Sequence, residues 1–353
     1  MPRRRAVTLA VSGTLLAGFA AGALFQTVPY AELSPGPTFD VLGTQDGSAN
    51  GTPLITITGH QTYPTTGQLR MVTVGVSEES YQMPLGEALV GWLSSDEAIV
   101  PKETIYPPGQ TQQQSDAENT QEMTDSQDAA VTAALGALNI KPTGSEVVVA
   151  SVTDGGPAAN KLQPGDVIDE VDGTAVAGGG DAGMNQVTGT IQKLTPGQQV
   201  TFEVTRDGKQ QSVTTGTQNN GGKAAVGISI ESENVFPFTV DIQLNNVGGP
   251  SAGMMFALGI IDKLTPDDLT GGRIVAGTGT IDAKGEVGAI GGIQMKTIGA
   301  RRAGATVFLA PAGNCAEAKA NQPAGLELVK VNTLQDALNA LADIRAGKTP
   351  PLC

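Results

Sequence analysis

The chain has 353 residues, of which 39% are hydrophobic, 4% aromatic and 16% charged, and its formal net charge is −14. This acidic balance argues against nucleic acid as a main partner, because the phosphate backbone requires clustered Lys and Arg. One histidine and two cysteines cannot form a four-ligand zinc site of the usual kind, and no P-loop sequence is present. We therefore expect no metal, cofactor or nucleotide. The length and composition suit two or three modest domains.

The first 25 residues predict the compartment. Residues 1–5 form a basic tail, and residues 6–25 contain no charge and are long enough to span a bilayer as a transmembrane helix. The basic flank favours the cytoplasmic side, so we expect a single-pass signal-anchor in the cell membrane with the body of the protein outside. The sequence Ala21-Gly22-Ala23 also fits a signal-peptidase site, which leaves a cleaved leader as the alternative.

Residues 26–106 predict a β-rich extension that is too small to fold alone. Alternating side chains over 54–58 and 69–74 predict two strands, and residues 59–67 predict the connection between them. We expect these strands to pair with the sheet of another domain, and the extension to pack on the C-terminal domain. His60 lies in the connection, where a solvated loop histidine is the ordinary outcome and a catalytic base is the alternative.

Residues 107–128 are rich in Pro, Gln and acidic residues and lack an apolar period, so we expect a flexible loop there. Helical spacing resumes at 129–138, and this helix opens a domain that we expect over 129–218. Its parts follow in a recognisable order: a strand at 147–150, Gly-Pro-Ala-Ala at 156–159, Gln-Pro-Gly-Asp at 163–166, a strand at 167–171, Asp-Gly at 172–173, a helix at 185–194 and a hairpin over 200–214.

In this order of parts, the segment resembles a PDZ domain of the bacterial protease type. The resemblance implies a small β-barrel with two helices that binds an extended peptide or protein C-terminus as an added strand beside a short helix. It also implies that the loop at 141–144 holds a terminal carboxylate. A purely structural or gating PDZ domain is the alternative.

The segment from Val247 to Met255 places a hydroxyl among small residues directly before an apolar run. Gly249, Pro250 and Ala252 surround Ser251, and the run that follows is long enough for a helix. Proline suits the first turn of a helix, and the free N–H groups and positive dipole end there suit a developing oxyanion. By itself the pattern also fits an ordinary capping serine.

A second motif changes the interpretation of this serine. Gly291-Gly292 opens another predicted helix, and Lys296 falls in its first turn beside apolar residues, where its charged form is disfavoured. These conditions turn a lysine into a base near neutral pH, whereas a solvated surface lysine is the ordinary alternative.

Taken together, Gly-Pro-Ser-Ala-Gly at 249–253, Gly-Thr-Gly at 277–279 and Gly-Gly-Ile-Gln-Met-Lys at 291–296 resemble the proteolytic domain of the Lon family. The resemblance covers 226–346 and implies a Ser–Lys dyad of Ser251 and Lys296, with Thr278 orienting the lysine. The sequence departs from the family at Gly249, where cytosolic Lon proteins carry an acidic residue. We expect this departure to alter loop closure without removing the nucleophile.

The whole chain is therefore predicted to be of mixed α+β class and resembles the membrane-anchored PDZ-containing Lon-like proteases of Gram-positive bacteria. The resemblance implies an ATP-independent serine endopeptidase acting on exported or misfolded proteins, and hexamers are common among Lon-type domains. The alternatives are a non-catalytic exported PDZ adaptor on a degenerate Lon-like scaffold and a Ser–His hydrolase that uses His60. In the tail at 347–353, export permits Cys353 to pair with Cys315, and two unpaired thiols remain the alternative.

Overall fold

The structure is a computed structural model that describes residues 2–48, 50–109, 111–206, 208–245 and 247–353. Within these ranges the side chains of residues 2–10, 17, 20 and 113 lie outside the description. The chain forms two units, and it enters and leaves the second unit twice. Unit 1 contains Met1–Thr56, Thr62–Ala133 and Ile242–Cys353, and unit 2 contains Ile57–Gln61 and Ala134–Asp241. The N-terminal and C-terminal segments of the chain thus share one unit.

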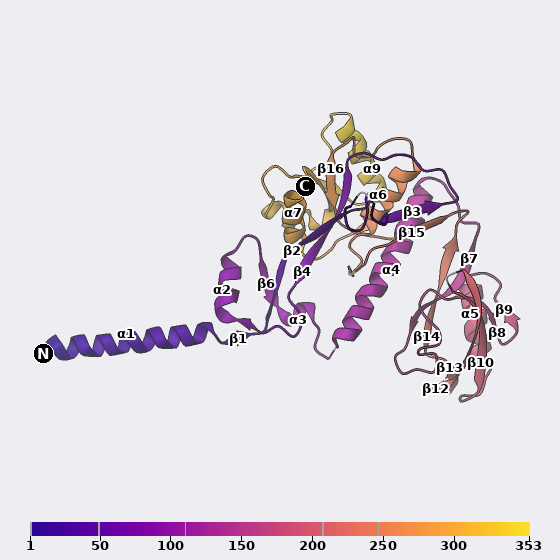
Figure 1. Ribbon diagram of the computed structural model, residues 1–353, viewed down its shortest axis with the longest axis horizontal. Coiled ribbons are helices and arrows are strands. Elements are labelled where there is room, and N and C mark those ends of the chain that lie inside the picture. Colours follow the sequence, from indigo (N-terminus) through magenta and orange to yellow (C-terminus); the bar gives the residue numbers. More distant parts are fainter. Residues whose placement is uncertain (1, 49, 110, 207, 246) are drawn as a thin grey trace. The chain divides into compact units, whose positions relative to one another are not determined.

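Unit 1 is organised around a six-stranded sheet in the order β20-β19-β16-β4-β2-β6, part of which is labelled in Figure 1. Strand β16 pairs in parallel with β19 and β4, whereas β2 pairs antiparallel with β4 and β6. Half of this sheet therefore comes from the segment at 26–106, which is too short to bury a sheet face by itself. The strands are β2 (Tyr30–Asp40), β4 (Gln68–Val76), β6 (Ala98–Pro101), β16 (Ile274–Gly277), β19 (Val307–Pro311) and β20 (Glu327–Val331).

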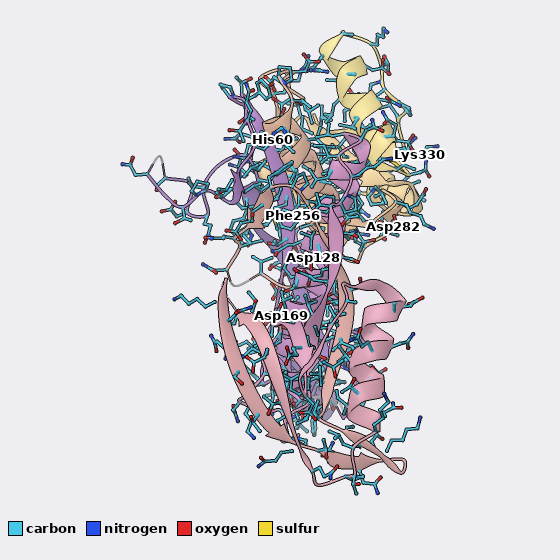
Figure 2. The ribbon with its side chains drawn as sticks, turned by 90° about the vertical axis from the view of Figure 1, so that its right-hand side faces the viewer. His60, Asp128, Asp169, Phe256, Asp282 and Lys330 are labelled. Carbon is cyan, nitrogen blue, oxygen red and sulfur yellow. A yellow bond between two sulfur atoms is a disulfide. The ribbon has the colours of Figure 1, made fainter. Side chains whose placement is uncertain are left out.

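Helix α6 (Gly253–Leu264) forms the core of unit 1. Every residue from Gly253 to Asp262 is buried, and Phe256, labelled in Figure 2, is fully inaccessible. A helix that is apolar on all sides must be covered on all sides, which the sheet and its neighbours achieve. The other described helices of unit 1 apart from α1 and α4 are α2 (Leu85–Leu93), α3 (Lys102–Ile105), α7 (Ile293–Arg302), the 3-10 turn η1 (Ala312–Asn314), α8 (Cys315–Ala320) and α9 (Leu334–Arg345).

Short two-stranded ladders lie outside the six-stranded sheet, in the segments that connect the larger elements. Strand β1 (Thr27–Val28) pairs with β5 (Met83–Pro84), and β17 (Thr280–Ile281) pairs with β18 (Val287–Gly288). The third ladder joins β3 (Ile55–Thr58) and β15 (Thr239–Ile242), the strands in which the chain passes from one unit to the other.

Helix α4 (Gln112–Ala137) replaces most of the flexible loop that the sequence predicts at 107–128. The prediction was wrong because it required a continuous apolar stripe along a helix. The side chains that α4 buries are a mixture of apolar, polar and small residues, including Met123, Ser126 and Ala130. Its Gln, Glu and Ala residues have good helix propensity, and Gln121 donates to Asp125 one turn along at 2.8 Å. The helix is thus stabilised by local propensity and tertiary packing rather than by an amphipathic stripe.

Helix α1 (Pro2–Leu24) occupies the segment predicted to cross a membrane. Among the described residues, no helix combines the length and apolar character that a membrane span requires. The predicted span at 6–25 therefore finds no support in the structure. Its residues 6–10, 17 and 20 lie outside the described side chains, and Ser12, Gly13 and Thr14 interrupt the apolar run among the described ones.

Unit 2 contains a six-stranded antiparallel sheet around a core that includes Val149, Ile168 and Phe202. Helix α5 (Gly180–Gln192) packs against strands β7 and β14. The strands of the sheet are β7 (Gly144–Val152), β8 (Val167–Val171), β9 (Thr174–Ala175), β10 (Gln199–Arg206), β11 (Lys209–Gly216) and β14 (Ile228–Val235), and a separate ribbon joins β12 (Gln218–Asn220) to β13 (Lys223–Ala225).

Strand β14 corrects one predicted boundary. The sequence analysis assigns residues from 226 onward to the Lon-type domain, but β14 pairs along its whole length with β7. Ile228 and Ile230 pack on the core of unit 2, so burial of their side chains decides the placement. The chain returns to unit 1 only at Ile242.

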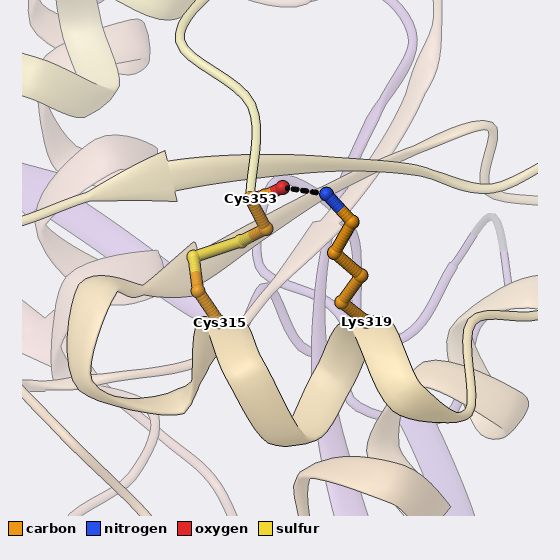
Figure 3. Close-up of a disulfide and its surroundings, with 3 residues drawn as sticks. All are labelled: Cys315, Lys319 and Cys353. Atoms are coloured by element: carbon orange, nitrogen blue, oxygen red, sulfur yellow. Dashed lines mark hydrogen bonds between the residues drawn. A yellow bond between two sulfur atoms is a disulfide. The ribbon is translucent and has the colours of Figure 1, made fainter.

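The two cysteines form a disulfide that ties the C-terminal tail to α8 (Figure 3). The bond joins Cys315 to Cys353 across 38 positions, and Lys319 donates to the Cys353 carbonyl at 2.7 Å. Cys353 N–H donates to Leu328 O, which lays the tail along β20. Of the two alternatives that the sequence left open, the structure shows the disulfide.

Candidate active site

The nucleophile loop, residues 248–252, is the part of the connection from β15 to α6 that directly precedes the helix. Gly249 has a φ of +85°, a conformation that favours glycine, and Ala252 occupies the N-cap position of α6. The Ser251 carbonyl accepts hydrogen bonds from Gly279 N–H and from Thr278 Oγ1, both at 2.9 Å. Because α6 begins at Gly253, Pro250 precedes the helix instead of lying in its first turn, and Ser251 is held by the two residues that connect β16 to β17.

Lys296 meets the serine from α7. Its Nζ lies 2.7 Å from Ser251 Oγ and 3.2 Å from Thr278 Oγ1, and the residue is only 4% exposed. Gly292, at the N-cap, has a φ of +66° and an added Cβ there would lie 2.8 Å from Val74, so a glycine is needed for α7 to begin so close to β4. The structure thus brings together Ser251, Lys296 and Thr278, three residues that lie far apart in the sequence.

Burial lowers the pKa of Lys296 to about 8. Among the described residues, its side-chain partners are the two hydroxyls and no carboxylate, so nothing stabilises the charged form against desolvation. Thr278 Oγ1 donates its own hydrogen bond to the Ser251 carbonyl and therefore accepts a hydrogen bond from Lys296 Nζ. A neutral amine then directs its lone pair toward the Ser251 hydroxyl, which is the orientation that a general base needs.

Two backbone donors lie beside the serine. Within the described parts of the chain, no protein acceptor pairs with the N–H of Ser251 or Ala252, while Gly249 N–H donates to Asn119 O at 2.9 Å. Both N–H groups lie directly before α6, at the end where the helix dipole is positive. They have the chemistry of an oxyanion hole.

A cavity of about 700 Å³ opens in front of this serine. Apolar side chains of the sheet and of α4 form much of its wall, among them Phe39, Met71 and Met123. Glu122 is the ionisable lining residue besides Lys296 in the described part of the chain, and burial raises the pKa of its carboxyl. The site is therefore large enough for side chains of a peptide on both sides of a reacting carbonyl.

His60 does not belong to this cavity. It lies in unit 2 with an exposed side chain, labelled in Figure 2, and its Nδ1 lies 2.9 Å from the carbonyl of the adjacent Gln61. Its ring contacts Phe238 with centroids 4.5 Å apart. The structure thus places this histidine as the solvated loop residue that the sequence analysis weighed against a catalytic base.

Sequence reasoning missed the contribution of α4. Asn119, Glu122 and Met123 line the cavity, and Ser126 donates to the Pro250 carbonyl at 2.9 Å. No periodicity or motif in residues 112–128 marks these positions, because each contact depends on the neighbouring loop. The one available signal was the richness of this segment in helix-forming residues.

Strand β14 lies at one edge of the sheet in unit 2, and β11 lies at the other edge. Strand β7, which follows the loop at 141–144, is paired on one side by β8 and on the other by β14, whereas β14 ends the strand order. Gly180 N–H, at the start of α5, donates to Ser232 Oγ of β14 at 2.6 Å. Strand β14 is thus the edge strand that packs against α5, and the expectation that the loop at 141–144 holds a terminal carboxylate stays a prediction.

Comparison with known proteins identifies two families in this chain. Residues 121–217 match the PDZ domain family, and residues 245–343 match the Lon protease (S16) C-terminal proteolytic domain. Lon protease 1 of Sorangium cellulosum is 38% identical over 101 residues, which are 28% of this chain and 12% of that protein. Lon protease 2 of Herpetosiphon aurantiacus is 47% identical over 66 residues, or 19% of this chain and 8% of that protein. The chain thus spans a small part of the length of these relatives.

Among solved structures, the PDZ domain of an SdrC-like protein from Listeria monocytogenes is 27% identical. The match covers 26% of this chain and 93% of that domain, with a TM-score of 0.22. A corresponding domain from Listeria innocua is 24% identical over 24% of this chain and 92% of that domain, also with a TM-score of 0.22.

Proposed function

We propose that this chain, whose residues 121–217 match the PDZ family and 245–343 the Lon proteolytic domain, is a serine endopeptidase in which Ser251 is the nucleophile and Lys296 the general base. One observation supports this assignment above all others. The Ser251 Oγ and the Lys296 Nζ lie 2.7 Å apart, and the lysine is buried without a carboxylate partner among the described residues. A lysine whose pKa is lowered to about 8 is partly neutral near physiological pH.

The proposed reaction begins when neutral Lys296 takes the proton of the Ser251 hydroxyl as the oxygen attacks a peptide carbonyl. The carbonyl oxygen becomes an oxyanion that the N–H groups of Ser251 and Ala252 stabilise, each such donor contributing about 3 kcal/mol. Protonated Lys296 then gives its proton to the leaving amine, and the C–N bond breaks to leave an acyl-enzyme. Water, deprotonated by Lys296, hydrolyses this ester and restores both residues. Each step uses groups of this chain and needs no nucleotide.

Substrates of this chemistry must present an extended backbone to a cavity of about 700 Å³. Flexible or partly unfolded proteins fit this requirement, and the PDZ domain provides a second place for an extended segment along β14. We propose that exported or misfolded proteins are cleaved. The disulfide between Cys315 and Cys353 supports a location outside the cytoplasm, since such bonds persist in oxidising compartments. Membrane attachment through residues 6–25 and hexamer formation stay predictions.

Active-site labelling tests the function directly. A fluorophosphonate probe should label the purified chain at Ser251, and Ser251→Ala should abolish both labelling and cleavage of a disordered protein such as casein. His60→Ala should keep full activity and serves as the control for a Ser–His mechanism. If the wild-type chain neither labels nor cleaves, the proposal is wrong and the non-catalytic adaptor is the better description.

A further inference from the structure

Helix α4 makes two hydrogen bonds to the nucleophile loop that the mechanism above does not use. Ser126 Oγ donates to the Pro250 carbonyl, and Gly249 N–H donates to the Asn119 carbonyl, each at 2.9 Å. Ser126 is only 4% exposed, so its hydroxyl has no alternative partner in bulk water. The helix therefore holds the peptide group between Gly248 and Gly249 and the peptide group between Pro250 and Ser251.

The loop is also fitted sterically to the helix. A Cβ at Gly248 would lie 2.8 Å from Asn119 Cβ, and a Cβ at Gly253 would lie 2.8 Å from Ser126 Oγ. Such distances are shorter than carbon and oxygen atoms tolerate, so both positions need glycine while α4 lies where it does. The contact between helix and loop is thus closely packed at both ends of the loop.

The Pro250 carbonyl and the Ser251 N–H belong to one planar peptide group. Because a trans peptide directs its C=O and N–H in opposite directions, a bond that fixes the carbonyl also fixes the direction of the N–H. That N–H is one of the two donors beside the serine that lack an acceptor among the described residues, and it is therefore available to an oxyanion at Ser251. Ser126 is therefore connected to the transition state through a single rigid group.

We propose that Ser126 is a positioning residue that orients the oxyanion donor of the proposed serine peptidase. The proposal rests on the proposed function, since an oxyanion hole has a role only if Ser251 attacks a carbonyl. It places an element outside the Lon-type segment, α4, among the parts on which the rate of cleavage depends. Ser126 acts on the N–H of Ser251 and does not touch the substrate or Lys296.

Kinetics of Ser126→Ala test this role. Loss of one hydrogen bond of ordinary strength should lower kcat and the rate of fluorophosphonate labelling about fivefold. KM for a peptide substrate and the pH midpoint should stay unchanged, since Lys296 is untouched. Ser126→Thr retains a hydroxyl and should recover most of the rate. Ser115→Ala removes a hydroxyl from the same helix away from the loop and should behave as wild type.

Two results would overturn the proposal while leaving the proposed function intact. One is wild-type labelling and cleavage by Ser126→Ala. The other is a loss of rate that merely follows the fraction of unfolded protein, measured by circular dichroism at the assay temperature. Failure of the wild-type chain itself to label at Ser251 would instead contradict the proposed function, and the positioning role with it.

Discussion

A lysine lies near each end of α6, the buried Lys296 of α7 and the half-buried Lys263 of α6 itself, and the two lysines have different surroundings. Burial lowers the pKa of both Lys296 at the N-terminal end and Lys263 at the C-terminal end. Asp40 and Asp262 oppose this effect at Lys263, whereas Lys296 has only hydroxyl partners among the described residues. Burial alone is therefore not sufficient to turn a lysine into a general base. A nearby carboxylate keeps a lysine charged, and its absence allows the lysine to lose its proton near neutral pH.

The largest expected effect comes from removing the unpaired lysine. Lys296→Met should lower kcat/KM by at least a thousandfold, because the general base is lost. The same change should raise the free energy of unfolding at pH 7 by up to about 3 kcal/mol, since it removes a desolvated charge. The sign follows from a folded-state pKa below the unfolded value of 10.5: the penalty is complete below pH 8 and disappears as pH rises from 8 to 10.5.

Urea unfolding and steady-state kinetics measure the two effects of Lys296→Met. Lys263→Met is the matched control at the other end of α6, and its activity should stay within about twofold of wild type because Lys263 lies outside the cavity lining. A control that loses as much activity as Lys296→Met would contradict the distinction between the two ends.

The next effect concerns the hydroxyl that orients Lys296. Thr278→Val removes the acceptor of the Nζ proton and the donor to the Ser251 carbonyl. Two hydrogen bonds at about 1 kcal/mol each predict a loss in kcat of roughly 30-fold. Thr278→Ser keeps both bonds and should retain most of the activity. Equal rates for the Val and Ser variants would show that the hydroxyl has no part in orientation.

The pH dependence of the wild-type chain should show the titration of Lys296. With a pKa of about 8, kcat/KM should rise with pH and level off above about pH 9. At pH 7 about one tenth of the lysine is neutral, so the rate should be roughly tenfold below the plateau. A stopped-time assay with a fluorogenic peptide from pH 6 to 10 measures the profile. A rate that falls across this range would contradict a lysine base.

The smallest expected effect concerns Asp262, near the C-terminal end of α6, and changes the free energy of unfolding instead of the activity. Burial raises the pKa of Asp262 to about 6, and its Oδ2 lacks a partner among the described residues. Since the folded-state pKa lies above the unfolded one, the carboxylate costs stability that is absent below pH 3.8 and complete above pH 6.

Asp262→Asn should therefore stabilise the fold at pH 7.5 by about 1–2 kcal/mol and give no such gain at pH 4. Chemical denaturation at the two pH values measures the difference, and kcat serves as the control because the residue is remote from the cavity lining. A gain of the same size at pH 4 would show that packing, not charge, is responsible.

Much of the candidate site was predictable from the sequence because its residues carry local signatures. Ser251 and Lys296 each follow a pair of glycines that the backbone needs for a close helix start, and the positive φ at Gly249 and Gly292 reflects that need. Thr278 lies between glycines for the same kind of reason, since an added Cβ at Gly277 or Gly279 would meet neighbouring side chains at 2.7 Å. Chemistry that requires close backbone approach leaves a pattern in the residue types.

The contacts of α4 left no such pattern. Ser126, Asn119 and Glu122 look like ordinary residues of a polar segment, and only the loop packed against them gives them a role. The placement of β14 was equally hidden, because Ile228 and Ile230 suit any half-buried strand and only the ladder with β7 selects the sheet.

The order of the parts and the choice of Ser251 and Lys296 as candidate nucleophile and base follow from the sequence alone. The tertiary structure decided which elements share a sheet, how the two cysteines pair and how α4 closes one side of the cavity. The physical reason lies in the range of the interactions. Turns, caps and glycine conformations depend on a few neighbouring residues, whereas strand partners and the environment of a buried lysine depend on residues far along the chain.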